Sequence, residues 1–462
     1  MTDTATTDST ATTGHARTDR TATDNAAAGA AVLEGAVADG AEVGTATTDG
    51  AATGAAAPAA AAPAAEAYLV PGTDRLAADF YSFQDELTPV EREASLRLRD
   101  FMEREVRPIA TDYWDRAEFP TQIIPGLAEL GMFGASWPET QRFENSAVWR
   151  GWAALELGRV DPSTATFVGV QSGLAMSSIA IGGSPEQRAQ WLPPMGRGEL
   201  IGAFGLTEPL SGSDSSKGLR TTAERHGDTW VLNGAKRWIG NATFADVVVI
   251  WARDVADNQV KGFLVRRGTP GFTTTKIERK QALRIVQNAD ITLDGVRVDE
   301  ADRLPNIHSF REVALVLRLT RAEVAWQAVG VQVGAYEAAV RYAAERQQFG
   351  RPLASFQLVQ DRLAQCLGNI TASIALCLQV SRMQDQGRQG DEHAALAKGY
   401  VTTRMRETVG WCRELLGGNG IVLDHGVAKF FADAEAVYSF EGTRDMNNLI
   451  VGRAITGVGA FV

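Results

Sequence analysis

The chain has few cysteines and histidines, and neither type shows the spacing of a disulfide framework or a metal site. Its 462 residues include 3 Cys and 5 His. Cys366, Cys377 and Cys412 form no Cys-x-x-Cys pair, and an odd number in so long a chain favours buried thiols in a reducing compartment. The histidines lack metal-ligand spacing, so we expect no metal site.

Long apolar runs and sorting signals are also missing. No uninterrupted apolar run of about 18 residues occurs, so the sequence predicts no membrane span. The first residues lack the positive region and apolar segment of a signal peptide, and the final Gly-Ala-Phe-Val is not a peroxisomal signal. A cytoplasmic location is the default expectation.

Basic residues are outnumbered by acidic ones, which argues against a polybasic binder of nucleic acid. The 45 Lys and Arg stand against 56 Asp and Glu, for a net charge of −11 and an isoelectric point of about 5.2. Residues 1–67 contain no Phe, Tyr, Trp or Lys. Because such a segment cannot bury enough apolar surface to offset its ordering entropy, we predict a disordered tail over 1–67.

Helical signals dominate the next part of the chain. Thr88-Pro89-Val90-Glu91 predicts a helix start, with Thr as the cap, Pro in the first position and Glu closing a capping box. Residues 147–182 are rich in Ala, Leu, Val and Ser, and predict one or two buried helices.

Short strand signals follow, and then the helical period returns. Strands are predicted within 228–239, with a hairpin turn at Asn233-Gly234, and at 247–253, 262–265 and 290–298, with a turn at Asp294-Gly295. The helical pattern resumes near Ser309 and is clear over 322–345, 356–384 and 394–416.

The order of these signals is helical, then β, then helical. We therefore predict an α+β fold, mainly α, with an N-terminal helical domain at 68–203, a β domain at 204–305 and a C-terminal helical domain at 306–462. Separate blocks of helices and strands argue against a doubly wound α/β fold. No Gly-x-Gly-x-x-Gly follows a strand, so a Rossmann nucleotide site is not supported.

Two segments of the β domain have residue types that suit a flat, polar cofactor. Phe204–Asp214 combines glycines, which allow a backbone to approach a ligand closely, with Thr and Ser hydroxyls. Trp238–Asn241 begins with a Trp that can wall off a flat ring system. Taken singly, the first segment is equally consistent with a polar loop and the second with a core Trp.

Three segments of the C-terminal domain carry further chemistry. Arg346, in Glu345–Gln357, can hold a phosphate through both arms of its guanidinium, and the glycines of Arg413–Ile421 can approach a pyrophosphate. Glu441 follows an aromatic-rich run, where burial would raise its pKa and make it a general base. Taken singly, these segments fit a helix end, a helix C-cap and an exposed ion-paired Glu.

In order and spacing, the five segments together resemble the acyl-CoA dehydrogenase family, over about Phe80 to the C-terminus. Within that family the chain is most similar to glutaryl-CoA dehydrogenase and to the short-chain acyl-CoA oxidase of plant peroxisomes. The stretches that carry this likeness are Phe204-Gly-Leu-Thr-Glu-Pro209, Lys236-Arg-Trp-Ile-Gly-Asn241, Phe244-Ala-Asp246, Leu415-Leu-Gly-Gly-Asn-Gly-Ile421 and Gly452-Arg-Ala-Ile-Thr-Gly457.

The resemblance implies a flavoprotein oxidoreductase of fatty acid metabolism. It implies a C-terminal four-helix domain, FAD between that domain and the β domain, and a homotetramer in which a neighbouring subunit supplies part of each FAD site. Glu441 is implied as the base that removes the α-proton of an acyl-CoA, while the β-hydrogen leaves as hydride to FAD. The product is a trans-2-enoyl-CoA, and electron-transfer flavoprotein is the expected acceptor.

The resemblance also assigns binding residues. The flavin is implied to contact Phe204, Leu206, Thr207, Gly212, Ser213, Trp238, Ile239 and Gly240. Thr443 and Asp445, which follow the base, are implied to contact FAD. The FAD of a neighbouring subunit is implied to contact Arg346, Phe349, Gln357, Leu415, Gly417 and Gly418. The acyl-CoA is implied to contact Ser213, Arg321 and Gly442.

Two positions bear on the base and on the substrate. Branched-chain and long-chain members have their base at the position immediately before the Arg equivalent to Arg321. In this chain Thr320 occupies that position, and Glu323 lies two positions after Arg321 instead of one before it. Glu441 is therefore the remaining candidate base. Glutaryl-CoA dehydrogenases hold the distal carboxylate with an Arg where this chain has Ala165, and no Lys or Arg lies between Asp161 and Ser172. An unpaired buried carboxylate is costly, so an unfunctionalised short acyl chain is favoured.

Several alternatives stay open. A decarboxylating glutaryl-CoA dehydrogenase and a short-chain oxidase that uses oxygen share the implied machinery. A flavin-free scaffold or acyl-CoA-binding protein on the same fold is a different class, as is a flavin monooxygenase or nitroalkane oxidase. The presence of Glu441 and of the flavin segments argues against these last classes.

Overall fold

The computed structural model describes residues 68–460, so the tail predicted over 1–67 lies outside the described residues. The first part is helical, as predicted. Its elements are η2 (Phe83–Glu86), α1 (Pro89–Phe101), η3 (Met102–Val106), α2 (Arg107–Arg116), η4 (Thr121–Ile123), α3 (Ile124–Glu129), α4 (Ala147–Val160), α5 (Pro162–Val168), η5 (Gly169–Met176), α6 (Ser177–Gly182) and α7 (Pro185–Gly196).

Local capping explains where these helices begin. The Thr88 side chain accepts from the backbone N–H of Glu91, and the Glu91 side chain accepts from the backbone N–H of Thr88. These two hydrogen bonds confirm the predicted capping box. Asp161 separates α4 from α5: it is extended before Pro162, and its carboxylate accepts from the N–H of Thr164 at 2.7 Å. The helical segment predicted over 147–182 is therefore interrupted once, at Asp161, which caps the start of α5.

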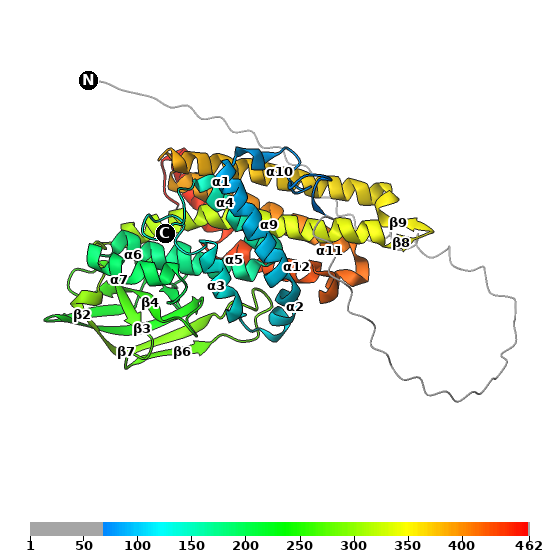
Figure 1. The fold of residues 1–462 in the computed structure, drawn as a ribbon. Helices are drawn as coiled ribbons and strands as arrows, with labels where there is room; N and C mark the ends of the chain where they lie inside the picture. Colours follow the sequence, from blue (N-terminus) through cyan, green and yellow to red (C-terminus); the bar gives the residue numbers. More distant parts are fainter. Residues whose placement is uncertain (1–67, 461–462) are drawn as a thin grey trace, which may run out of the picture. The chain divides into compact units, whose positions relative to one another are not determined.

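A seven-stranded sheet follows. It contains β1 (Gly202–Gly205), β2 (Thr222–His226), β3 (Thr229–Ile239), β4 (Val247–Asp254), β5 (Val260–Arg266), β6 (Phe272–Lys276) and β7 (Ala289–Asp299), with α8 (Ser215–Gly218) between β1 and β2. The order is β1-β4-β2-β3-β7-β6, and β5 pairs with β4. Figure 1 shows α6 and α7 lying over one side of this sheet.

Two predicted turns are wrong. Asn233-Gly234 lies inside β3 and Asp294-Gly295 inside β7, where the two strands face each other across a register shift. The N–H of Gly295 donates to Asn233 Oδ1 at 2.8 Å, so the two dipeptides close one β-bulge. A Cβ on Gly234 would lie 2.6 Å from Thr221 Oγ1, so the glycine serves close packing; the real hairpin turns at Gly227-Asp228.

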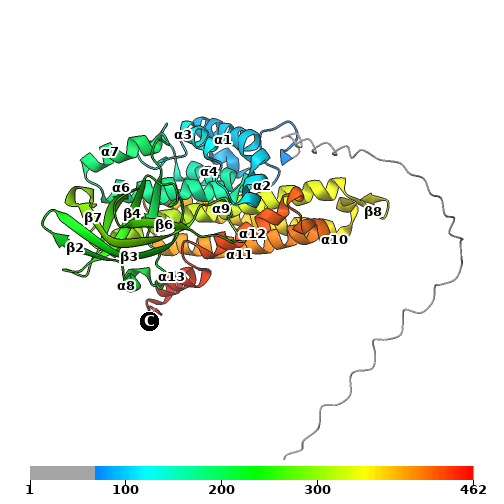
Figure 2. The same ribbon diagram turned by 90° about the horizontal axis from the view of Figure 1, so that it is seen from below.

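Long helices form the rest of the body. They are α9 (Phe310–Glu345), α10 (Gln357–Asp385), α11 (Asp391–Leu415), α12 (Val427–Ser439) and α13 (Arg444–Thr456), joined by β8 (Gln347–Gln348), β9 (Arg351–Pro352), η7 (Leu353–Ser355), η8 (Gly417–Ile421) and η9 (Leu423–His425), and preceded by η6 (Glu300–Asp302). Figures 1 and 2 show α9, α10 and α11 side by side, with β8 and β9 at the end far from the sheet.

Helix α9 is the central element, packed between α4 and α11. A Cβ on Gly330 would lie 2.2 Å from the carbonyl oxygen of Leu155, so this glycine is what lets α4 approach. Nearby, the fully buried Arg159 of α4 pairs with Glu156 at 3.1 Å and with Glu337 of α9 at 2.9 Å. These contacts fix the position of α9, which carries part of the cavity wall described below.

Two helical stretches among the described residues are long and apolar enough to cross a membrane by length and composition alone. Residues 162–182 are mostly buried in the body, and α10 packs one face against α9 and α11. Core helices of folded proteins pass the same test. Neither stretch is a clear membrane span.

Candidate active site

A cavity of about 750 Å³ lies where the sheet meets the helices α4, α5, η5 and α9 and the loop between α12 and α13. Most residues predicted to touch the flavin or the substrate within one subunit face this cavity. They are Phe204, Leu206, Thr207, Gly212, Ser213, Trp238, Ile239, Gly240, Arg321, Glu441, Gly442 and Thr443. Sequence segments more than 200 residues apart therefore meet at one place.

The segment after β1 is anchored to β3. The backbone N–H of Arg237 donates to the carbonyl of Thr207 at 2.8 Å, and Lys236 Nζ donates to Glu208 at 2.8 Å and to the carbonyl of Leu206 at 3.2 Å. Burial lowers the pKa of Lys236 to about 8, while Glu208 opposes the shift. This ion pair holds the loop so that its glycines and hydroxyls reach the cavity.

The cavity wall on this side fits a flavin. Within the described residues, the hydroxyls of Thr207 and Ser213 make no hydrogen bond, and a Cβ on Gly212 would meet open space. Trp238 keeps 51% of its area exposed and adopts a left-handed backbone (φ 65°), which presents a broad apolar surface at the end of β3. A flat ring with polar edges matches this combination of unpaired hydroxyls and a Trp face.

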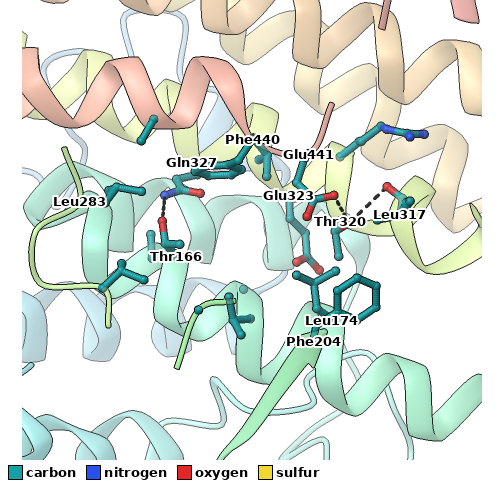
Figure 3. A pocket seen from close by; sticks show the side chains of 18 of the residues that line it. Thr166, Leu174, Phe204, Leu283, Leu317, Thr320, Glu323, Gln327, Phe440 and Glu441 are labelled. Carbon is teal, nitrogen blue, oxygen red and sulfur yellow. Dashed lines mark hydrogen bonds between the residues drawn. The ribbon is translucent and has the colours of Figure 1, made fainter. Parts of the chain in front are cut away.

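Glu441 lies in the loop between α12 and α13. Its backbone is left-handed (φ 54°), and Gly442 continues the turn at φ 84°. Thr320 Oγ1 donates to Glu441 Oε2 at 2.9 Å, a contact visible in Figure 3. Burial raises the pKa of Glu441, while the Thr320 hydrogen bond and the charges of Arg321 and Lys398 oppose the shift. The carboxylate is thus a sheltered base facing the cavity.

The loop that carries Glu441 is held from α11 and α13. The fully buried Lys398 Nζ donates to the carbonyls of Tyr438 at 2.7 Å and Gly442 at 2.8 Å. Asn447 Nδ2 also donates to the Gly442 carbonyl, at 2.9 Å. The left-handed turn is therefore fixed by three hydrogen bonds, which stabilise a strained conformation.

Arg321 is placed one residue beyond Thr320, at the cavity edge. Within residues 68–460 its buried Nε has no hydrogen-bond partner and its guanidinium forms no ion pair. A buried donor without an acceptor is costly, so Nε of this half-buried side chain is available to an acceptor that enters the cavity. A phosphate or carbonyl of an acyl-CoA matches that requirement.

The cavity wall also contains polar side chains to which the sequence assigned no role. Gln327 Nε2 donates to Thr166 Oγ1 at 2.9 Å, which joins α9 to α5. Arg150 and Glu323 also face the cavity, from α4 and α9. Nothing local in the sequence marks Arg150. Glu323 was considered only as a base and set aside because of its position relative to Arg321. Its place on α9, one turn after Thr320, indicates that it lies on the same helix face as Thr320.

Seven predicted cofactor residues are not brought to the cavity. Asp445 is exposed on α13. The other six lie around the far end of α9, where Asn419 Nδ2 donates to the Tyr342 hydroxyl at 2.9 Å and so ties η8 to α9. Phe349 is 92% exposed there, with a left-handed backbone. The six are Arg346, Phe349, Gln357, Leu415, Gly417 and Gly418, and their assignment to a neighbouring subunit's FAD stays a prediction.

The cysteines lie apart from the cavity wall. All three cysteines are buried and free, and Cys366 and Cys412 have their sulfurs 3.9 Å apart. Within the part of the chain that the structure describes, no cluster of three or more His, Cys, Asp or Glu side chains is arranged to hold a metal ion.

Comparisons with known proteins give the same picture. Family models of the acyl-CoA dehydrogenase N-terminal, middle and C-terminal domains match residues 88–199, 203–296 and 310–456. The mitochondrial short-chain specific acyl-CoA dehydrogenase of Mus musculus is 31% identical over 363 residues, which is 76% of this chain and 87% of the mouse protein.

Solved structures are similar as well. A glutaryl-CoA dehydrogenase from Mycobacterium smegmatis superimposes with a TM-score of 0.81 at 38% identity, covering 84% of this chain and 99% of that chain. A second structure of a glutaryl-CoA dehydrogenase from this organism, in complex with FADH2, gives a TM-score of 0.80 at 33% identity, covering 83% and 98%. With all three domains matched in order, the chain belongs to the acyl-CoA dehydrogenase family of FAD-dependent oxidoreductases.

Proposed function

We propose that this protein converts a short-chain acyl-CoA into its trans-2-enoyl-CoA, with Glu441 as the base. The observation that carries the proposal is the placement of Glu441: its carboxylate faces the same cavity as Trp238 and Ser213, and within the described residues only Thr320 donates to it. A sheltered carboxylate with one donor is basic enough to remove a weakly acidic α-proton once a nearby group stabilises the enolate.

The chain supplies the other parts of this step. The backbone N–H of Glu441 donates no hydrogen bond within residues 68–460, so it is available to the thioester oxygen as charge develops there. Thr320 Oγ1 lies within 3.3 Å of the Val316 and Leu317 carbonyls as well as near Glu441. Its single hydrogen can stabilise the charged carboxylate, or turn to a carbonyl when protonated Glu441 becomes the donor.

FAD, when bound, supplies the acceptor for the hydride that leaves the β-carbon. Thr207, Ser213, Trp238 and the glycines near them would hold its ring system. The exposed segments at the far end of α9 would complete the FAD site of a second copy, as in a homotetramer. Electron-transfer flavoprotein is the proposed acceptor of the electrons.

Short-chain specificity is supported by the mouse relative, which is a short-chain specific enzyme, and by Ala165, which offers no cation to a distal carboxylate. The Mycobacterium smegmatis neighbours are glutaryl-CoA dehydrogenases, so that activity stays the second candidate. A short-chain acyl-CoA oxidase that uses oxygen is the third candidate. Reoxidation of the reduced protein by air, compared with reoxidation by electron-transfer flavoprotein, separates the oxidase from the dehydrogenases.

The test is anaerobic mixing of the FAD-loaded protein with butyryl-, hexanoyl- and glutaryl-CoA while the flavin absorbance is followed. We expect bleaching by at least one acyl-CoA, and Glu441→Gln should slow it by about 10²–10⁴-fold while FAD and acyl-CoA still bind. The exposed Glu105→Gln is the matched control. Bleaching of Glu441→Gln within about tenfold of wild type would show that another group is the base.

A further inference from the structure

Two opposite charges face the cavity without pairing with each other. Glu323 lies on α9, one turn after Thr320, and Arg150 lies on α4, which packs against α9. Each is close enough to shift the other's pKa, yet they form no ion pair. The flavin segments and the base do not account for either side chain.

The Glu323 carboxylate accepts no hydrogen bond from any residue in 68–460. Gly173 leaves the space that it occupies, because a Cβ there would lie 2.8 Å from Glu323 Oε2. Figure 3 shows the carboxylate beside Leu174 and Phe204, below Glu441. Burial raises the pKa of Glu323 to about 7, Arg150 opposes the shift and Glu441 adds to it. The half-buried carboxylate therefore faces the cavity without a donor from the described residues.

Arg150 is satisfied on one arm only. Its Nη1 donates to the carbonyl of Asn145 at 3.2 Å and to Asn145 Oδ1 at 2.8 Å, whereas Nε and Nη2 donate to no residue that the structure describes. Two other acids influence it, but Asp385 accepts from the N–H of Ala147 and Glu91 from Thr88 and Ser146. The remaining donors of Arg150 are free for a ligand in the cavity.

We infer that the acyl group of the substrate carries a neutral hydrogen-bonding substituent, a carboxamide or a hydroxyl, whose oxygen accepts from Arg150 and whose hydrogen donates to Glu323. A plain alkyl chain would cover both side chains and leave them unsatisfied, which is unfavourable. A carboxylate would meet Arg150 but also the carboxylates of Glu323 and Glu441. The inference rests on the proposed dehydrogenation of an acyl-CoA and names its substrate class.

Three acyl-CoAs of nearly equal shape test this preference. 4-Carbamoylbutyryl-CoA carries the carboxamide, glutaryl-CoA replaces it by a carboxylate, and 5-methylhexanoyl-CoA replaces it by a branched alkyl end. A second matched pair, 4-hydroxybutyryl-CoA and pentanoyl-CoA, tests the hydroxyl. For the FAD-loaded wild type we expect a specificity constant for flavin reduction about tenfold or more higher for the better neutral polar substrate than for its alkyl or carboxylate partners.

Variants assign the preference to these two side chains. Glu323→Leu and Arg150→Met should each reduce the polar-to-alkyl ratio about tenfold, whereas Glu93→Leu, an exposed change on α1, should leave it unchanged. Glu323→Gln keeps the shape of the side chain and removes its charge, so it should raise the specificity constant for glutaryl-CoA. This variant also tests the role of Glu323 if Glu323→Leu does not fold.

The outcomes separate the two proposals. If acyl-CoAs bleach the flavin but the alkyl substrates match or exceed their polar partners in the wild type, or if Glu323→Gln and Arg150→Met leave every ratio unchanged, the substituent inference is wrong and the dehydrogenase proposal stands. If no acyl-CoA of the panel bleaches the flavin, the dehydrogenase proposal itself fails.

Discussion

Lys398 Nζ donates to the carbonyl oxygen of Gly442 at 2.8 Å, directly behind the residue proposed as the base. The lysine is fully buried on α11, and burial lowers its pKa to about 7, while Glu441 opposes that shift. A buried amine with two backbone acceptors thus fixes a loop that leaves α12 and enters α13. The position of Glu441 is determined by a residue of a third helix.

Lys398→Met is expected to displace the Glu441 loop. The carbonyls of Tyr438 and Gly442 would lose a buried donor, which costs about 2–3 kcal/mol of unfolding free energy. Flavin reduction should slow by about 10- to 100-fold, since small misplacements of a catalytic group have effects of that size. Anaerobic reduction rates and denaturant unfolding check both, with Lys261→Met on β5 as control. Equal rates in the two variants would contradict the expectation.

Thr320→Val is expected to move the acid limb of the pH profile. The base must be deprotonated to act, so kcat/KM rises with pH through the pKa of Glu441, which burial has already raised. Removing the Thr320 donor destabilises the charged carboxylate, so the pKa of Glu441 and the acid limb both move to higher pH.

The control for this shift is Thr320→Ser, which keeps the hydroxyl and should keep the limb near that of the wild type. Arg321, Lys398 and Glu323 also influence Glu441, and all three are present in both variants. A limb in Thr320→Val that stays in place, or moves to lower pH, would show that the hydrogen bond does not stabilise the charged base.

Arg159→Leu is expected to destabilise the protein strongly. The fully buried guanidinium pairs with Glu103, Glu156 and Glu337, which join η3, α4 and α9. Removing it leaves the buried Glu337 without a cation, while Glu156 keeps Arg99 and Glu103 keeps Arg107, and breaking a buried pair costs roughly 3–5 kcal/mol. Denaturant unfolding measures the loss. The exposed pair Arg197–Glu199 provides a control, since Arg197→Leu should have little effect on the unfolding midpoint.

Phe349→Ser is expected to lower FAD content and weaken assembly. Phe349 keeps 92% of its area exposed and lies at the far end of α9, where a second copy would cover it. The ratio of flavin to protein absorbance and the sedimentation of the purified protein check the two effects. Val255→Ser, at an exposed apolar residue of the β4–β5 turn, is the control. Full FAD content and unchanged assembly would exclude this segment from the cofactor site.

Helix starts were predictable because their causes lie within a few residues. The capping box at Thr88 and the cap at Ser309 each involve a side chain and an amide no more than three positions away. The Asn-Gly and Asp-Gly turns failed for the opposite reason. Gly234 and Gly295 are bulged because β3 and β7 pair with each other and Thr221 packs against Gly234, which are contacts between distant segments.

The candidate site divides in the same way. The base and the flavin segments were found because their order and spacing carry a family resemblance. Arg150 was missed, because an Arg in a helix indicates a solvent-facing side chain until the partner helix is known. Glu323 was seen but set aside, since its register relative to Arg321 excludes one role without revealing the cavity that it faces.

By itself, the sequence determined the order of helices and strands, the fold class, the family and Glu441 as the candidate base, because these depend on local patterns and on motif spacing. Only the tertiary structure decided that α4 and α9 place Arg150 and Glu323 in one cavity, and that Lys398 holds the loop of Glu441. Side chains from separate helices acquire a common function when packing brings them together, and the resulting burial removes them from water and shifts their pKa values.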